Sequence, residues 1–151
     1  MPSPASQALG LSLEQLEAQG VLPKLDRGTD IKGPDANNNG VRDDIEAYIA
    51  RLPLTDAQKR AAMQSARVQQ KSLLMDLSNK TEVKALGDAS LAATACMGEV
   101  FKGASISDDS LSLKIEAITA NTPERGRRYM QYMRALSGTS SPWPEGNPCE
   151  P

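Results

Sequence analysis

Apolar residues follow a helical repeat through most of the chain after residue 42. In the first such stretch, four apolar positions fall at i, i+3, i+4 and i+7, which places them on one face of a helix. They are Ile45, Tyr48, Ile49 and Leu52. Pro53 cannot continue the helix because it lacks a backbone N–H. The pattern therefore predicts a helix over about residues 43–52.

Helix start signals divide the rest of the chain into four more helices. Thr55, Ser107 and Thr122 each precede an acid or a proline in the way that N-cap residues do. Thr81 is expected to cap a long helix that reaches Phe101. No segment alternates in the manner of a strand. The sequence thus predicts an all-α fold, a small bundle of about four to five helices.

The chain before the bundle is less regular. Ser12 and Gln15 have the spacing of a capping box, which predicts a short helix that ends at Gly20. The following residues, 21–34, contain prolines and glycines and are expected to form an irregular connection. The predicted organisation is a disordered segment 1–11, a single helical domain 12–137 and a Pro-rich tail 138–151 docked on that domain.

The composition of the chain excludes or disfavours several classes of function. The 151 residues are enough for one domain, and aromatic residues make up only 3% of them, so the core must be aliphatic. Charge is balanced, with 17 basic and 19 acidic residues, which disfavours nucleic acid as a partner. The chain has no histidine, which excludes histidine-based catalysis and metal ligation. No apolar run is long enough to span a membrane.

One segment carries a metal-ligand pattern. Residues 35–46 read DANNNGVRDDIE and fit the template D-x-[DN]-x-[DN]-G-x5-E at every fixed position. Ca²⁺ prefers six to eight oxygen ligands, and this loop can supply them at alternating positions. The expected ligands are Asp35, Asn37, Asn39, the Val41 carbonyl, Asp43 and Glu46, with Glu46 placed to offer both carboxylate oxygens.

A reading without metal explains part of this segment. Asn39-Gly40 is a common turn, and Asp43 and Asp44 are ordinary acids at a helix N-terminus. That reading leaves unexplained the alternation of Asp35, Asn37 and Asn39 and the presence of Glu46 at the twelfth place. Calcium is therefore the expected ligand of the loop, and Asp44 is expected to point outward.

The segment resembles the EF-hand-type calcium loops of bacterial exported proteins, akin to dockerin and thrombospondin type 3 loops. The resemblance covers the loop and the helix that leaves it. The chain departs from paired EF-hands because it has one loop, Gly33-Pro34 in place of an entering helix, and Arg42 at the usually apolar eighth position. These departures argue for a structural calcium ion, which is expected to fix residues 21–34 onto the fold.

The two cysteines favour export. Cys96 lies on an apolar stripe and Cys149 lies in the Pro-rich tail, so a disulfide between them would pin the tail to the bundle. The N-terminus lacks a recognisable signal peptide, but it fits a mature exported chain. We expect a periplasmic or secreted protein rather than a cytoplasmic one. Trp143 is expected to lie against the helices.

Other charged and sulfur-containing residues have two interpretations. Arg125, Arg127, Arg128 and Arg134 form either a solvated helix face or a contact patch for an acidic partner. The helical methionines, such as Met130 and Met133, are expected to fill the core.

Three functional hypotheses remain open. The first is a non-enzymatic exported protein that uses calcium as a structural clamp and binds an unknown protein or envelope component. The second is an immunity-type inhibitor of a secreted toxin. The third is an enzyme that uses calcium to hold a loop over carboxylates such as Glu14, Glu17 or Glu82. No nucleophile motif supports the third.

Overall fold

The computed structural model describes residues 12–151, and these residues form six helices and no strand. The predicted disorder of residues 1–11 lies outside this range. The helices are α2 (Leu13–Ala18), α3 (Asp43–Arg51), α4 (Asp56–Leu74), α5 (Lys80–Val100), α6 (Asp108–Thr119) and α7 (Pro123–Leu136). The all-α prediction is confirmed. No helix within residues 12–151 combines the length and the apolar character that crossing a bilayer requires.

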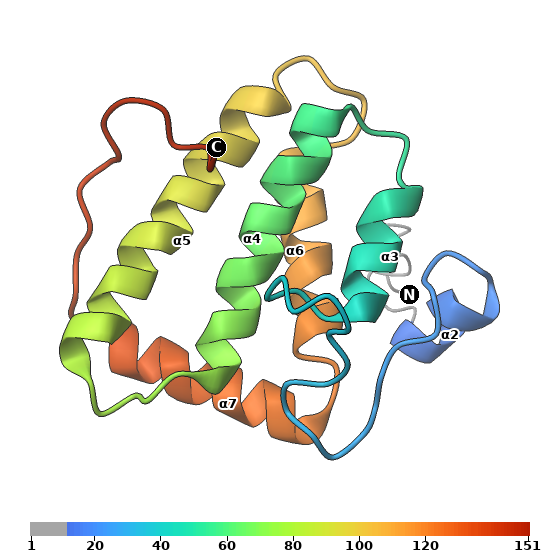
Figure 1. Cartoon of the computed structure of the whole chain (residues 1–151), viewed down its shortest axis with the longest axis horizontal. Coiled ribbons are helices and arrows are strands. Elements are labelled where there is room, and N and C mark those ends of the chain that lie inside the picture. The colour runs from blue at the N-terminus through green and yellow to red at the C-terminus, as the bar shows by residue number, and fades with distance from the viewer. Residues whose placement is uncertain (1–11) are drawn as a thin grey trace, which may run out of the picture.

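Helices α3, α4, α5 and α6 run side by side, and α7 crosses the ends of α4 and α5 (Figure 1). The long helices α4 and α5 make the most extensive contact. The tail after α7 returns along α5 (Figure 1), so both the tail and the loop before α3 lie against the same bundle.

Local sequence signals set most helix starts. Capping boxes form at Ser12–Gln15 and Thr55–Gln58, and single caps form at Ser107 and Thr122. The predicted cap at Thr81 is wrong by two residues. Asn79 caps α5 instead, because its side chain accepts a hydrogen bond from the Glu82 N–H.

The core has two parts. The larger part joins α3 to α4, α5 and α6 through small and β-branched residues, which allow close helix packing. Its most buried members include Val41, Ile45, Ile49, Ala62, Ala66, Cys96, Met97, Ile115 and Ile118. The smaller part packs α7 on α5 around Val83, Leu86 and Tyr132. Gly87 makes this contact possible, since a Cβ there would lie 2.7 Å from Leu136 Cδ1.

Two expectations about the core are wrong. Met130 and Met133 are about half exposed, and Tyr132 takes the buried place on α7. Trp143 is 67% exposed and does not clamp the tail. The disulfide holds the tail instead.

The predicted disulfide joins Cys96 of α5 to Cys149, with the two Cα atoms 4.9 Å apart. Hydrogen bonds surround this link. The Gln64 side chain donates to the Pro148 carbonyl at 3.0 Å and accepts from the Glu150 N–H at 2.9 Å. The tail therefore ends on α4 as well as on α5.

Candidate functional site

The backbone of loop 35–46 curls into a closed turn in front of α3. Asn38 and Gly40 both have positive φ, at 53° and 83°, and Gly40 supplies the freedom that the tighter bend needs. The Asp43 N–H donates to the Pro34 carbonyl at 2.9 Å, which joins the two ends of the loop. Val41 is fully buried in the core and anchors the loop to the bundle.

The structure brings three of the predicted ligands together. The Asn37 Nδ2 lies 3.3 Å from both oxygens of Glu46, and the Asn39 Nδ2 lies 3.0 Å from Glu46 Oε2. Asp35 organises the turn, since its carboxylate accepts from the N–H groups of Asn39 and Gly40 at 3.1 and 3.0 Å. Side chains separated by up to nine residues thus converge on one carboxylate.

The remaining predicted ligands have other contacts. The Asp43 carboxylate accepts from the Ala36 N–H at 3.1 and 3.3 Å, and the Val41 N–H donates to Asn39 Oδ1 at 3.0 Å. Within residues 12–151, no three side chains drawn from His, Cys, Asp and Glu gather in a way that could hold a metal ion. The convergence at Glu46 therefore rests on asparagine amides rather than on carboxylates alone.

Arg67 of α4 joins the loop to the C-terminal tail. Its Nε donates to the Asn39 carbonyl at 3.0 Å, and its guanidinium pairs with the Glu150 carboxylate. A Cβ on Gly40 would lie 3.2 Å from Arg67 Cγ, so the loop backbone lies directly against this side chain. No pattern in the sequence predicts this contact.

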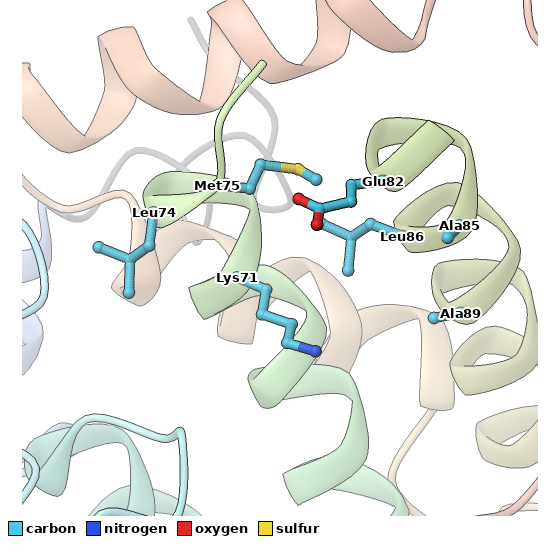
Figure 2. A pocket seen from close by; sticks show the side chains of 7 residues that line it. All are labelled: Lys71, Leu74, Met75, Glu82, Ala85, Leu86 and Ala89. Carbon is cyan, nitrogen blue, oxygen red and sulfur yellow. The ribbon is translucent and has the colours of Figure 1, made fainter. Parts of the chain in front are cut away.

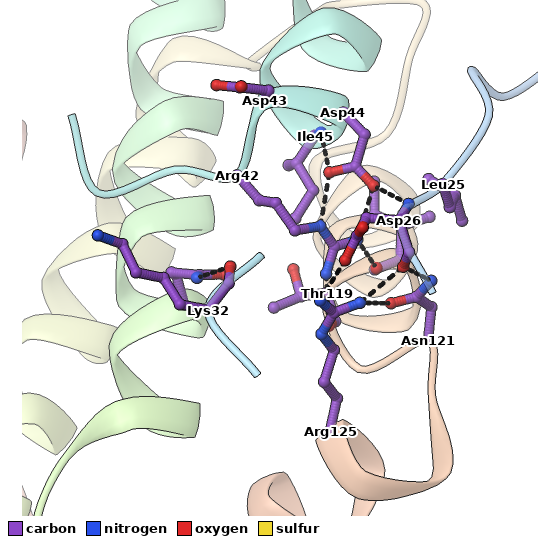
Figure 3. Close-up of polar contacts among 12 residues, drawn as sticks. Leu25, Asp26, Lys32, Arg42, Asp43, Asp44, Ile45, Thr119, Asn121 and Arg125 are labelled. Carbon is purple, nitrogen blue, oxygen red and sulfur yellow. Dashed lines mark hydrogen bonds and ion pairs between the residues drawn. The ribbon is translucent and has the colours of Figure 1, made fainter. Parts of the chain in front are cut away.

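Two fully buried arginines, one from the loop and one from α7, approach each other (Figure 3). Arg42 pairs with Asp44 through Nε and Nη2, at 2.6 and 2.9 Å, and also donates to the Ile118 carbonyl at 2.8 Å. Asp44 was expected to point outward, and this expectation is wrong. Its carboxylate neutralises Arg42 and also accepts from the Asp26 N–H at 2.8 Å. The eighth loop position therefore points into the fold.

Arg125 holds the irregular connection before the loop. Its guanidinium donates to the Asp26 carboxylate at 2.6 Å and to the carbonyls of Asp26, Asp30 and Ile31 at 2.7, 2.9 and 3.1 Å. Asn121 supplies one more acceptor at 3.0 Å. Protein side chains thus fix residues 26–31 onto α7. From the sequence, calcium was expected to hold this part of the chain.

The interpretation of the four late arginines as one surface group is wrong for Arg125 and incomplete for Arg128. Arg128 donates to the carbonyls of Leu73 and Met75, at 2.9 and 3.3 Å, and so caps the C-terminal end of α4. A signal for Arg125 was present, because it lies at i−4 and i−7 from Tyr129 and Tyr132, on the face of α7 that packs inward.

Gly33 allows the two arginines to approach. It has a φ of 68°, and a Cβ there would lie 2.6 Å from Arg42 Cδ and 2.9 Å from Arg125 Nη2. Any larger residue would displace both side chains. Gly33 therefore makes room for the arginine cluster, a name that we give to Arg42, Asp44, Asp26 and Arg125.

The arginine cluster makes stability depend on acidity. The hydrogen bond from Arg125 holds the pKa of Asp26 below its usual range, because it favours the charged carboxylate. A depressed folded-state pKa gives stability that is present above the unfolded value, about pH 4, and is lost as the pH falls through the folded value.

We expect Asp26→Asn to flatten the fall in stability below about pH 4, because the variant has no carboxylate to protonate at this position. Urea unfolding at a series of pH values measures the slope. Asp30→Asn is the matched control, since the side chain of exposed Asp30 has no contact with Arg125. A wild-type slope retained in Asp26→Asn would contradict the assignment.

The three carboxylates of the enzyme hypothesis do not form one site. Glu14 and Glu17 both pair with Arg27, whose Nη1 lies 2.8 Å from Glu17 Oε1. This hydrogen bond lowers the pKa of Glu17, which is the opposite of what a general acid needs.

Glu82 lies apart from that pair, in a groove of about 450 Å³ between α4 and α5. Figure 2 shows Glu82 and Lys71 at the wall of this groove, among apolar side chains. Glu82 is the one carboxylate among the described residues that line the groove. The groove therefore offers Glu82 no second carboxylate with which it could form an acid–base pair among the described residues.

Comparison of the chain with protein-family models, with curated proteins and with solved structures gives no match.

Proposed function

We propose that loop 35–46 binds Ca²⁺ and that the protein is an exported, non-enzymatic binding protein in which calcium clamps this loop. The observation that carries the proposal is the convergence of Asn37 and Asn39 on Glu46. The closure of the loop between Pro34 and Asp43 supports the proposal, as does the burial of Val41, which holds the loop to the core.

The donor set suits calcium chemistry. An asparagine amide presents either its nitrogen or its oxygen after a half-turn about its last bond. With the oxygens turned toward Glu46, Asn37 and Asn39 would offer neutral hard ligands beside a carboxylate, and Asp35 and Asp43 would add charge. The mixed set of asparagines and a backbone carbonyl is typical of calcium and not of the softer metals, which prefer nitrogen and sulfur.

The disulfide supports export to the periplasm or out of the cell. Structural disulfides persist in oxidising compartments, and a tail fixed through Cys149 suits a periplasmic or secreted protein. Calcium is plentiful in such places, so a weak site would still be filled. The partner would be another protein or an envelope component.

We expect isothermal titration to show calcium binding at millimolar or lower concentrations, with magnesium at least about tenfold weaker, because magnesium loses its water reluctantly and needs a tighter octahedron. Glu46→Gln should weaken calcium binding by about tenfold or more, since it removes the charged ligand on which the loop converges.

Glu82→Gln is the matched control, because Glu82 also lies in the first turn of a helix but far along the chain from the loop. It should bind calcium like the wild type. Absence of heat with calcium, or equal losses in the two variants, would contradict the proposal.

A further inference from the structure

Trp143 is the most exposed of the large hydrophobic side chains within residues 12–151, at 67%. A tryptophan ring offers a large apolar surface, and such rings often anchor protein interfaces. Pro142 and Pro144 flank Trp143 and restrict the backbone, because proline fixes φ. The tail therefore presents this ring with little backbone freedom to lose on binding.

Two attachments to α5 hold the segment that carries Trp143. Before it, the Ser141 hydroxyl donates to the Asp88 carboxylate, and after it Cys149 is joined to Cys96. Figure 1 shows the tail lying along the outer side of α5 between these attachments. The ring is therefore displayed from a fixed segment beside this helix.

The groove of about 450 Å³ between α4 and α5 offers an apolar surface beside the same helix. Its apolar wall is formed by Leu74, Met75, Ala85, Leu86 and Ala89. Because Ala85 and Ala89 are small, the groove can admit a large ring. Trp143 of the same chain does not line it, so the tail passes along α5 without filling the groove. Exposed apolar surfaces of this kind mark interaction sites.

We infer that this groove receives Trp143 of a second copy of the chain. Each copy carries both the ring and the groove beside α5, so two copies related by a two-fold axis can make the contact twice.

Charge complementarity supports this occupant. Exposed Glu145 follows Trp143 by two positions, and exposed Lys71 lies at the groove wall, so the two charges can pair when the ring is seated. Glu82 is the other charged residue of the wall, and it can stay in water because it is exposed.

The contact is small, so the dimer is expected to be weak. A tryptophan ring buries at most about 250 Å². Two rings and the two groove walls that they cover therefore bury about 1,000 Å² or less in total, below the range of stable interfaces. We expect a dissociation constant of about 0.1–1 mM.

Nuclear magnetic resonance over a dilution series, from about 0.05 to about 2 mM protein, tests for this dimer. The chain has one tryptophan and therefore one indole N–H signal. We expect this signal and the backbone signals of Ala85 and Ala89 to shift together with one dissociation constant, while translational diffusion slows from that of a monomer toward that of a dimer. Diffusion that does not change with concentration, or an indole shift without shifts in the groove, would overturn the proposal.

Variants on each side of the contact separate it from unspecific association. Trp143→Ala should weaken association by about tenfold or more, as the loss of an interface anchor does. Ala85→Glu should have a similar effect, because it puts bulk and negative charge into the groove at an exposed position that the fold tolerates. The matched control Leu113→Ala removes the next most exposed large side chain, at 63%, and should associate like the wild type. Association that survives Trp143→Ala or Ala85→Glu, or that falls equally in Leu113→Ala, would overturn the proposal.

A double-mutant cycle tests the charge pair. Lys71→Met should weaken association by about threefold in the wild type and leave it unchanged in Glu145→Gln, since an exposed ion pair contributes only modestly. Equal losses in the two backgrounds would overturn the pairing that supports a second copy as the occupant.

Discussion

Replacement of Arg125 by methionine is expected to lower the free energy of unfolding by about 3 kcal/mol, as is found when one partner of a buried ion pair is removed. Methionine keeps most of the volume but none of the donors. The carbonyls of residues 26, 30 and 31 and the Asp26 carboxylate would then lose their partner. The expected loss lies at the low end of what is found for buried ion pairs, because the Asp26 side chain is 26% exposed and can regain water.

Urea denaturation measures this loss. Arg127→Met provides the matched control, since Arg127 is an exposed residue of the same helix and should change stability by less than about 0.5 kcal/mol. Equal stability of the two variants would show that the buried guanidinium contributes nothing net. Hydrogen exchange in Arg125→Met should rise first in residues 21–34, because Arg125 holds that connection.

Reduction of the disulfide is expected to cost about 4 kcal/mol in the chain-entropy model, because the bond closes a loop of 53 residues. The bond joins the tail to α5 next to its contacts with Gln64 and Arg67, so these contacts should weaken as well.

The comparison of wild type and Cys149→Ser, each with and without reductant, isolates the contribution of the disulfide. This variant leaves Cys96 in the core and therefore creates no cavity there. Reductant should destabilise the wild type and leave Cys149→Ser unchanged. A loss below about 1 kcal/mol in the wild type would mean that the tail is held by its other contacts.

Local signals were enough to predict the helices, apart from the start of α5, and the presence of only two cysteines was enough to predict their pairing. Caps such as Thr55 and Thr122 act within four residues, so the sequence alone specifies them. The turn of loop 35–46 is local as well, since Gly40 and Asp35 contact each other within one short segment. The spacing of residues along the sequence is therefore enough to predict these features.

The arginine cluster could not be predicted in this way, because its partners come from distant parts of the chain. Arg125 contacts Asp26 across 99 positions, and no periodicity marks such a pair. A charged residue is ordinarily read as exposed, and only tertiary contacts reverse that reading.

Because of the arginine cluster, calcium is expected to order a shorter part of the chain. Since Asp44 and Arg125 hold residues 26–31 without an ion, binding of calcium should order the loop and not the connection before it. We therefore expect the response to calcium to be local.

Hydrogen exchange measured with calcium and with a chelator shows whether the ion orders loop 35–46. Calcium should increase protection within residues 35–46 and at the start of α3, and should leave α4 to α7 unchanged apart from the general gain that binding confers on global stability. Unchanged exchange in residues 35–46 would contradict the assignment of the calcium site to this loop.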